Sequence, residues 1–260
     1  MMKVIRSRDN PAYKAWKNLA RSGRERKKAG ATLLEGMHLL TAWQARHGLP
    51  QTVLVGDQGR ARPEIADWLT ANPTAEVVCL PDKLLAELAD TETPSGILAE
   101  VVIPGPDQSP AHDKDCVLLD GIQDPGNLGT LLRTAAAAGF SQVLLSPDSV
   151  GAWSPKVLRA GQGAHFLLDL HEGQDLPGFL ASYRGTSLAT CLEGATSLYA
   201  AEWQGPLAWI FGAEGTGVRP KTLAQARHRI TIPMPGAVES LNVGAAAAIC
   251  LFETVRRRQA

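Results

Sequence analysis

In the second half of the chain, short apolar runs alternate with longer segments whose apolar residues recur at helical spacing. Near-continuous apolar runs of four or five residues predict strands that are buried on both faces. A final helix is predicted over residues 241–258, because three consecutive arginines at its end favour a helix C-terminus. Strands separated by helices indicate an α/β fold, a parallel sheet with helices on both faces. The predicted strands are residues 116–119, 142–145, 166–170, 186–190, 207–211 and 229–232.

The first half alternates in the same way on a smaller scale, behind a basic segment that is predicted to be helical over residues 10–28. Residues 104–114 hold three prolines and a glycine among polar residues, which is typical of a linker. We therefore predict a basic helical arm at 1–30, a small α/β domain at 31–103, this linker, and a larger domain at 115–260. Within the small domain the predicted strands are 31–34, 51–55, 75–80 and 96–103, and the predicted helices are 36–46, 63–71 and 82–89.

The charge is distributed unevenly. The 260 residues carry no net charge, but the first 30 hold ten Lys or Arg and two acids, a net charge of +8. The rest of the chain is therefore at −8. A basic arm on an acidic body suits a polyanionic partner such as RNA, because Lys and Arg displace counterions from phosphates. The alternative is a solvated helix that is merely basic.

Other classes of protein are disfavoured by composition. Apolar residues make up 45 % and charged residues 20 % of the chain, as in globular proteins. No apolar run reaches the length of a membrane span, and the N-terminus has no apolar signal core. The four cysteines are scattered without a CxxC pair, so neither a zinc site nor a disulfide framework is predicted. We expect a cytoplasmic protein that has no membrane partner and no metal.

Three loops that follow predicted strands carry the candidate chemistry, since ligands of such sheets bind at the carboxyl ends of strands. The first contains Asp124-Pro125-Gly126-Asn127, a strong turn sequence that places Asn127 as a helix N-cap. Arg133 is the only charge in the apolar helix that follows. An arginine on a largely buried helix needs a partner or must extend to solvent, so Arg133 is either functional or structural.

The second loop, residues 212–218, has three glycines around Glu214 and lacks the spacing of a dinucleotide-binding fingerprint. Alone it is a weak signal. The third loop begins near Ile232, is stiffened by two prolines, and places Ser240 and Asn242 at a helix start, where plain capping is the simplest interpretation. The small residues 244–248 allow close backbone approach.

Taken in order, the three loops resemble the motifs of the SpoU/TrmH family in the SPOUT superfamily, which are RNA ribose 2′-O-methyltransferases. The matching segments are residues 124–139, 211–218 and 232–253, and Ser-Leu-Asn-Val at 240–243 is the most specific match. The resemblance covers about residues 115–258. Glu35-Gly36 and residues 93–97 are weaker landmarks, similar to the substrate-binding domain that is common in the family.

The resemblance implies a deep trefoil knot at the C-terminus, S-adenosylmethionine as cofactor, and a homodimer packed through the knotted domain. It also implies no metal. Cofactor contacts are then expected from Leu192, Gly212, Ile232, Met234 and Leu241. Catalysis is expected to use Arg133, with Asn127, Glu214, Ser240 and Asn242 positioning Arg133, the ribose or the cofactor. Gly244 and Ala213 depart from the family pattern, where many members carry serine and a polar residue.

The predicted function is 2′-O-methylation of a ribose in structured RNA, with 23S ribosomal RNA favoured. An arginine has a pKa above about 12, so Arg133 is as able to orient the hydroxyl and phosphate as to assist deprotonation. One alternative is a tRNA ribose methyltransferase, and another is a non-catalytic RNA-binding or assembly protein on the same fold. A nicotinamide-dependent oxidoreductase is disfavoured, because its glycine loop would follow the first strand of the domain.

Overall fold

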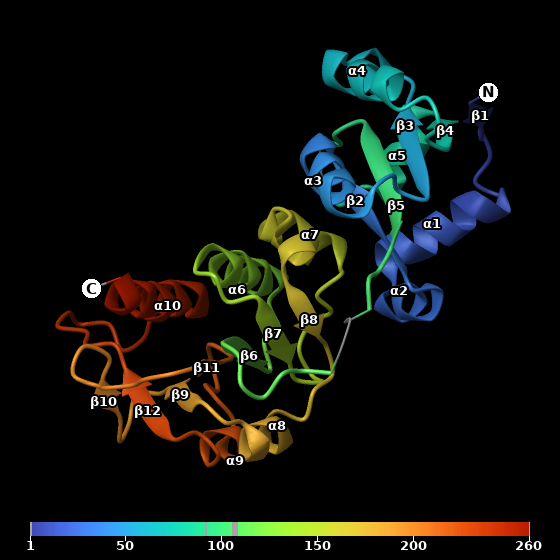
Figure 1. Cartoon of the computed structure of the whole chain (residues 1–260). Coiled ribbons are helices and arrows are strands. Elements are labelled where there is room, and N and C mark those ends of the chain that lie inside the picture. The colour runs from blue at the N-terminus through green and yellow to red at the C-terminus, as the bar shows by residue number, and fades with distance from the viewer. Residues whose placement is uncertain (1, 92, 106–108, 260) are drawn as a thin grey trace. The chain divides into compact units, whose positions relative to one another are not determined.

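The computed structural model describes residues 2–91, 93–105 and 109–259 of the chain (Figure 1). Its contacts divide the chain into two compact units. The first unit comprises residues 1–104 together with 153–166, and the second comprises residues 105–152 together with 167–260. Among the described residues, no helix is both long and apolar enough to cross a membrane.

The first unit is built on a mixed sheet with strand order β1-β4-β3-β5-β2 in the described part of the chain. Strands β1, β4 and β3 pair in parallel, whereas β5 runs antiparallel to both β3 and β2. The strands are β1 (Lys3–Val4), β2 (Ala31–Glu35), β3 (Thr52–Gly56), β4 (Val77–Leu80) and β5 (Ile97–Val102). The helices are α1 (Pro11–Arg21), α2 (Gly23–Ala29), α3 (Met37–His47), η1 (Gly59–Ala61), α4 (Pro63–Ala71), α5 (Asp82–Leu88) and α7 (Pro155–Gly161).

The basic segment differs from the single helix predicted over residues 10–28. It forms two helices, because Ser22 leaves helical geometry and its side chain accepts a hydrogen bond from the amide of Glu25, which caps α2. The apolar side of α1 is buried: Tyr13, Trp16 and Leu19 join the core formed with α5 and the sheet. Helix α1 is thus part of the first unit, whereas α2 has no buried residue.

Helix α7 is the other difference, because it comes from the middle of the methyltransferase-like sequence and yet packs on the first unit. The hydroxyl of Thr32 in β2 donates to the backbone oxygen of Trp153 at 2.8 Å. Arg159 in α7 forms an ion pair with Asp90 at 2.8 Å. Periodicity along the sequence holds no signal for such a long-range placement.

The predicted linker at 104–114 lies partly outside the described residues, at 106–108. Its second part is attached to the second unit. The amide of Ala111 donates to the side-chain oxygen of Gln142 at 2.7 Å, and the His112 carbonyl accepts from the amide of Arg184 at 2.7 Å. Asp113 forms an exposed ion pair with Arg184 at 2.6 Å.

The second unit confirms the predicted α/β fold. Its sheet has the order β10-β12-β9-β11-β6-β7-β8, and every neighbouring pair in the described residues is parallel. The strands are β6 (Cys116–Asp120), β7 (Gln142–Leu145), β8 (Asp169–His171), β9 (Thr186–Thr190), β10 (Thr196–Ser197), β11 (Leu207–Gly212) and β12 (His228–Thr231).

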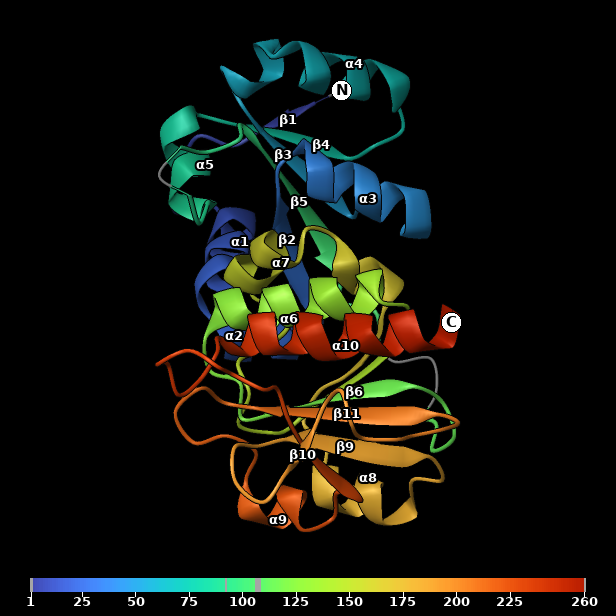
Figure 2. The same cartoon turned by 90° about the vertical axis from the view of Figure 1, so that its left-hand side faces the viewer.

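Helices cover both faces of this sheet: α6 and α10 lie on one side, and α8 and α9 on the other (Figures 1 and 2). The apolar core on the α8 side includes Phe179 and Tyr183 packed on Ile210 and neighbouring strand residues. The trefoil knot stays a prediction, since strand order alone does not test it. The helices are α6 (Pro125–Ala137), α8 (Leu176–Ser182), α9 (Pro220–Leu223) and α10 (Val243–Gln259).

The strand predicted at 166–170 is wrong in its bounds. The helix η2 (Ala164–Leu167) occupies the first part, and only β8 pairs with β7. Phe166 is buried against Trp43 of the first unit, with ring centroids 5.3 Å apart, so an aromatic contact rather than a ladder holds this segment. The apolar run predicts a strand, but its first side chain, Phe166, packs against Trp43 of α3 instead.

Gly244 explains one departure from the family pattern. A Cβ atom at this position would lie 2.9 Å from Cγ2 of Thr130 in α6 and 3.1 Å from the side-chain oxygen of Asn242. Real Cβ atoms essentially never approach another atom within 3.0 Å. Helices α10 and α6 therefore meet so closely in this chain that serine does not fit at 244 without a shift.

We expect Gly244→Ser to lower the thermal midpoint of unfolding, because overpacking of a filled contact costs about 1–3 kcal/mol. Calorimetry of the purified variant measures it. Ala245→Ser, at an exposed neighbouring position, is the control and leaves the midpoint unchanged. Adding Thr130→Ala to Gly244→Ser removes the opposing methyl group and restores stability. A midpoint equal to that of the wild type in the single variant contradicts the contact.

Candidate active site

The parallel sheet brings four loops to one edge. Strands β12, β9, β11 and β6 are successive neighbours, so their carboxyl ends lie side by side. The loops that leave these ends include residues 121–124, 191–194, 213–218 and 232–242. They contain the three sequence motifs, together with the short loop after β9.

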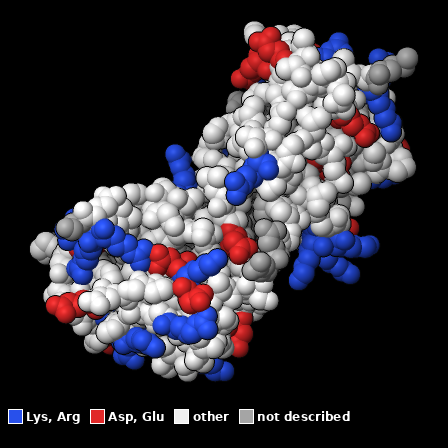
Figure 3. Space-filling view, viewed as in Figure 1, with Lys and Arg blue, Asp and Glu red and all other residues white. Residues whose placement is uncertain are grey.

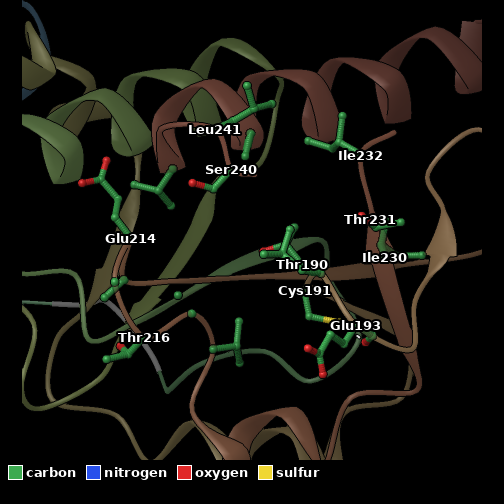
Figure 4. Close-up of a pocket in the computed structure, with 18 of the residues that line it drawn as sticks. Thr190, Cys191, Glu193, Glu214, Thr216, Ile230, Thr231, Ile232, Ser240 and Leu241 are labelled. Carbon is green, nitrogen blue, oxygen red and sulfur yellow. Dashed lines mark hydrogen bonds between the residues drawn. The ribbon is translucent and has the colours of Figure 1, made fainter. Parts of the chain in front are cut away.

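One cavity of about 420 Å³ lies among the loops after β9, β11 and β12, a volume in the range of small-molecule sites. Figure 4 shows Ser240 and Leu241 on one side of it, Cys191 and Glu193 opposite, and Glu214 at one end. Two residues predicted to position the reaction, Glu214 and Ser240, line it. So do all the residues predicted to contact the cofactor: Leu192, Gly212, Ile232, Met234 and Leu241.

The lining fits S-adenosylmethionine. Ile230, Ile232, Met234 and other apolar side chains offer the surface that an adenine ring and a thioether chain require. Glu193 and Glu214 are the carboxylates of the lining, and they suit a ligand that carries hydroxyl groups, an ammonium and a sulfonium. Glu193 was missed at the sequence level, because an acid after a strand has no motif of its own.

Gly212 allows the second loop to fold back on itself. A Cβ at this position would lie 2.0–2.2 Å from backbone atoms of Gly217 and Val218. The amide of Gly217 donates to the carbonyl of Ala213 at 2.7 Å and closes the turn. The wall of the cavity therefore depends on the absence of a side chain at 212, which is the close approach that glycine permits.

Asn127, Glu214 and Asn242 form a triangle of hydrogen bonds that joins the three motif loops. The side-chain amide of Asn127 donates to Oε1 of Glu214 at 2.9 Å. The amide of Asn242 donates to the same Oε1 and to Oδ1 of Asn127. The other carboxylate oxygen of Glu214 makes no hydrogen bond with the described residues. Three residues that lie far apart in the sequence are thus held at one point.

Two local predictions about capping are changed. The N-cap of α6 is Asp124, whose side chain accepts from the amide of Asn127 at 2.7 Å, so Asn127 is not the cap as predicted but lies in the first turn. Pro125 occupies the first helical position, so the helix starts three residues earlier than predicted. Asn242 does cap α10: its Oδ1 accepts from the amide of Gly244 at 2.9 Å.

A second cavity of about 410 Å³ shares residues 213–216 and Val243 with the first. Asp120 and Arg219 line this cavity. Asp120 is buried, and Nε of Arg219 donates to its Oδ1 at 2.7 Å. Arg219 also pairs with Asp148 at 3.0 Å. The hydrogen bond from Ser146 lowers the pKa of Asp148, as do a backbone hydrogen bond and then the charge of Arg219. The hydrogen bond to Asp120 raises the pKa of Arg219.

Asp120, Asp148 and Arg219 were missed by sequence reasoning. Asp120 did carry a signal, because an acid at the end of an apolar strand needs a cation once it is buried. The sequence does not say which of the chain's arginines supplies it. The partner lies 99 residues away, at the start of α9.

Like Asn242, Arg133 lines neither cavity. It is exposed, whereas its neighbours Leu131 and Leu132 are buried. No hydrogen bond or ion pair links Arg133 to the described residues, so of the two predicted alternatives, a partner or extension into solvent, the second holds. The exposed side of α6 leaves its guanidinium in solvent. Its catalytic role stays a prediction.

Among the described residues, no group of three or more His, Cys, Asp or Glu side chains is arranged to hold a metal ion.

Comparison with known protein families identifies the family of the chain. The model of the SpoU rRNA Methylase family matches residues 115–252. The chain belongs to the SpoU rRNA methylase family. The MRM3-like substrate binding domain matches residues 10–99, which includes the basic helices α1 and α2. The family predicted from the three motif loops is confirmed, and with it the enzyme class, an RNA ribose 2′-O-methyltransferase.

Similar proteins cover nearly the whole chain. The 23S rRNA (guanosine(2553)-2′-O)-methyltransferase RlmP of Bacillus subtilis is 32 % identical over 96 % of this chain and 98 % of its own length. An uncharacterised tRNA/rRNA methyltransferase of Synechocystis is 35 % identical over 98 % of this chain and 94 % of its own. The structure of the SpoU methyltransferase AviRb from Streptomyces viridochromogenes with AdoMet covers 96 % of this chain and 99 % of its own, with 26 % identity and a TM-score of 0.85. S-adenosylmethionine is confirmed as the cofactor of this SpoU methylase.

Proposed function

We propose that this protein transfers the methyl group of S-adenosylmethionine to a ribose 2′-hydroxyl in 23S ribosomal RNA. It acts in the cytoplasm as a homodimer that is formed through the knotted second unit. The RNA assignment to 23S rRNA rather than tRNA is supported by the name of the RlmP relative, which matches over nearly its whole length.

The observation that carries the proposal is that the two cavities share a wall. Glu214 lines both, and the hydrogen bonds from Asn127 and Asn242 fix it there. A cofactor in the first cavity and a nucleotide in the second are thereby neighbours. Methyl transfer requires this proximity, since holding two reactants in place supplies much of the rate gain.

The residues of the chain then have distinct tasks. S-adenosylmethionine, when bound, supplies an electrophilic methyl group on a sulfonium. Glu214 offers its free carboxylate oxygen to the ribose 2′-hydroxyl, which must lose its proton as its oxygen takes up the methyl group. Ser240 borders the cofactor cavity, and Asn127 and Asn242 orient the carboxylate. Arg133 holds the phosphate or hydroxyl of the target nucleotide, with the guanidinium charge retained.

Transfer of labelled methyl groups to unmodified 23S rRNA and, separately, to unmodified tRNA tests the proposal. We expect label in the 23S rRNA, in ribose rather than base, after digestion to nucleosides. Label only in tRNA overturns the substrate assignment. The precursor ribosomal particle is tested as a third substrate. If S-adenosylmethionine binds but none of the three substrates becomes labelled, the enzymatic function is overturned and a non-catalytic assembly protein is favoured.

The basic surface of α2 is proposed to bind the RNA backbone. Arg24, Lys27 and Lys28 are exposed on this helix. Figure 3 shows a group of Lys and Arg side chains projecting at the place that α2 occupies in Figure 1. Each charge that contacts a phosphate changes the salt slope of the binding constant by about one unit. We expect the triple change to glutamine to weaken RNA binding and to lower this slope, as measured by filter binding at several salt concentrations.

Deletion of residues 1–28 is not a clean version of this test, because it removes Tyr13 and Trp16 from the core of the first unit. The control is Lys14→Gln with Arg8→Gln, which removes charge from residues paired with Asp9 and Glu87. This control leaves the salt slope unchanged. A triple variant on α2 with an unaltered slope contradicts the proposed contact.

A further inference from the structure

The cofactor cavity contains a carboxylate that the protein itself leaves unpaired. Glu193 lines this cavity of about 420 Å³ and follows the end of β9 by three residues. Its side chain makes no hydrogen bond and no ion pair with the residues that the structure describes. Methyl transfer gives tasks to Glu214 and Ser240, but it does not explain Glu193. A carboxylate without a protein partner in a ligand-sized cavity is available to the ligand.

The loop after β9 fixes the backbone at Glu193. Sγ of Cys191 donates to the carbonyl of Glu193 at 3.4 Å and closes a turn. Gly194 follows with a φ of +61°, a left-handed conformation that glycine adopts without strain. Arg229 of β12 comes near, since its Nη1 lies 3.7 Å from the place of a Cβ at Gly194, but it forms no ion pair with Glu193. The backbone is thus held while the carboxylate stays free.

The two ends of the cavity differ in chemistry. In Figure 4, Glu193 lies at the end with Ile230 and Ile232. Glu214 and Thr216 lie at the opposite end, which adjoins the second cavity, so the reacting methyl group belongs there. The apolar end suits an adenine ring, and it disfavours the amino-acid half of the cofactor, whose own carboxylate a second carboxylate repels. The nucleoside half is therefore the part within reach of Glu193.

The place of Glu193 in the sheet is one where a carboxylate meets a ribose. In dinucleotide-binding sheets, a glycine-rich loop follows one strand, and an acid after the neighbouring strand accepts from a ribose hydroxyl. Here β9 and β11 pair in parallel, with Glu193 after β9 and the glycine loop after β11. Neighbouring strands lie about 4.8 Å apart, so one nucleoside reaches both ends. The acid precedes the loop in this chain, but contact depends on neighbouring strand ends rather than on chain order.

We propose that the carboxylate of Glu193 accepts hydrogen bonds from the 2′- and 3′-hydroxyls of the cofactor's own ribose. Two adjacent hydroxyls match the two oxygens of one carboxylate, and hydrogen bonds to a charged acceptor are stronger than neutral ones. Glu193 is thus a residue of cofactor specificity. The inference concerns the bound cofactor alone and holds whichever RNA receives the methyl group.

A binding measurement on the full wild-type chain tests the proposal. The probe is S-adenosylhomocysteine, whose neutral sulfur removes the attraction between a sulfonium and any nearby carboxylate. Its affinity is compared with that of its 2′,3′-dideoxy analogue by competition with labelled S-adenosylmethionine in equilibrium dialysis. We expect the analogue to bind about 10-fold more weakly, because the carboxylate loses both donors. Equal affinity of the two compounds overturns the proposal without any variant.

Glu193→Ala assigns the selectivity to the residue. We expect this variant to bind S-adenosylhomocysteine about 10-fold more weakly than the wild type, and to bind the dideoxy analogue with an affinity within about two-fold of that. Glu193→Gln keeps an oxygen acceptor without the charge, so its loss is intermediate. The control is Glu202→Ala, which removes an exposed glutamate of the same unit outside the cavity and retains both wild-type affinities.

The other outcomes each contradict the contact. If Glu193→Ala binds S-adenosylhomocysteine weakly but still prefers it to the dideoxy analogue, the ribose is not the partner. An analogue that lacks the amino group then binds wild type and variant equally if the cofactor's ammonium is the partner instead. Unchanged affinity in Glu193→Ala excludes either contact. The proposed function is tested separately: absence of methylation in every RNA pool refutes it and leaves the ribose selectivity standing.

Discussion

Arg133→Ala is expected to abolish methyl transfer while cofactor binding and stability remain at wild-type levels. A charged group that orients or activates the nucleophile contributes about 10²–10⁴-fold to the rate. The side chain is exposed and lines neither cavity, and alanine is favourable in a helix such as α6. Neither the fold nor the cofactor cavity therefore loses a contact. Labelled methyl transfer and calorimetric titration of S-adenosylmethionine measure the two effects on one preparation.

The matched control is Arg184→Ala, an exposed arginine of the same unit that pairs with Asp113. It tests whether loss of any surface arginine lowers activity through weaker binding of RNA. We expect the control to keep nearly full activity. Full activity in Arg133→Ala contradicts the catalytic assignment, because the reaction then does not depend on this side chain.

Gly212→Ala is expected to eliminate binding of S-adenosylmethionine. The new methyl group would lie 2.0–2.2 Å from the backbone of Gly217 and Val218, and backbone cannot rotate away as a side chain can. The loop after β11 must open, which costs about 1–3 kcal/mol or more, and with it moves the wall that carries Glu214. Equilibrium dialysis of labelled cofactor measures the loss.

Gly215→Ala is the control within the same loop. It also lines the cavity, but no atom lies within 4 Å of a Cβ placed there. We expect Gly215→Ala to bind S-adenosylmethionine with an affinity within a few-fold of the wild type. If both variants bind equally well, the loop is not held by the turn at 212, and the cavity wall owes its shape to other contacts.

The sequence predicted the second unit closely, because its strands are buried on both faces and appear as apolar runs. The predicted strands at 142–145 and 186–190 coincide with β7 and β9. The errors occur where tertiary contacts, rather than the local sequence, determine the secondary structure. Strand β1 is two exposed residues that exist only through pairing with β4, and no pattern marks them. The break at Ser22 was readable, since Ser22 and Glu25 have the spacing of a helix start.

The candidate site was predicted in part for a similar reason. Residues at strand ends of a parallel sheet converge on one edge, so the order of strands and loops along the chain is enough to group Gly212, Ile232 and Leu241. The partners of Glu214 and Asp120 depend on side-chain geometry across 87 and 99 residues, and spacing does not encode that. The sequence left open whether Arg133 is paired or extends into solvent, because an apolar helix still has one face in solvent.

The excursion of residues 153–166 into the first unit affects how the protein is made. Val157 and Leu158 of α7 are buried, and α7 packs on β2. During vectorial synthesis the first unit therefore cannot finish folding when residue 104 leaves the ribosome, because one of its helices has not yet been translated. Completion waits until residue 166 has emerged, by which time β6, α6 and β7 are also available. A chimera joined at residue 104 therefore separates α7 from its own sheet.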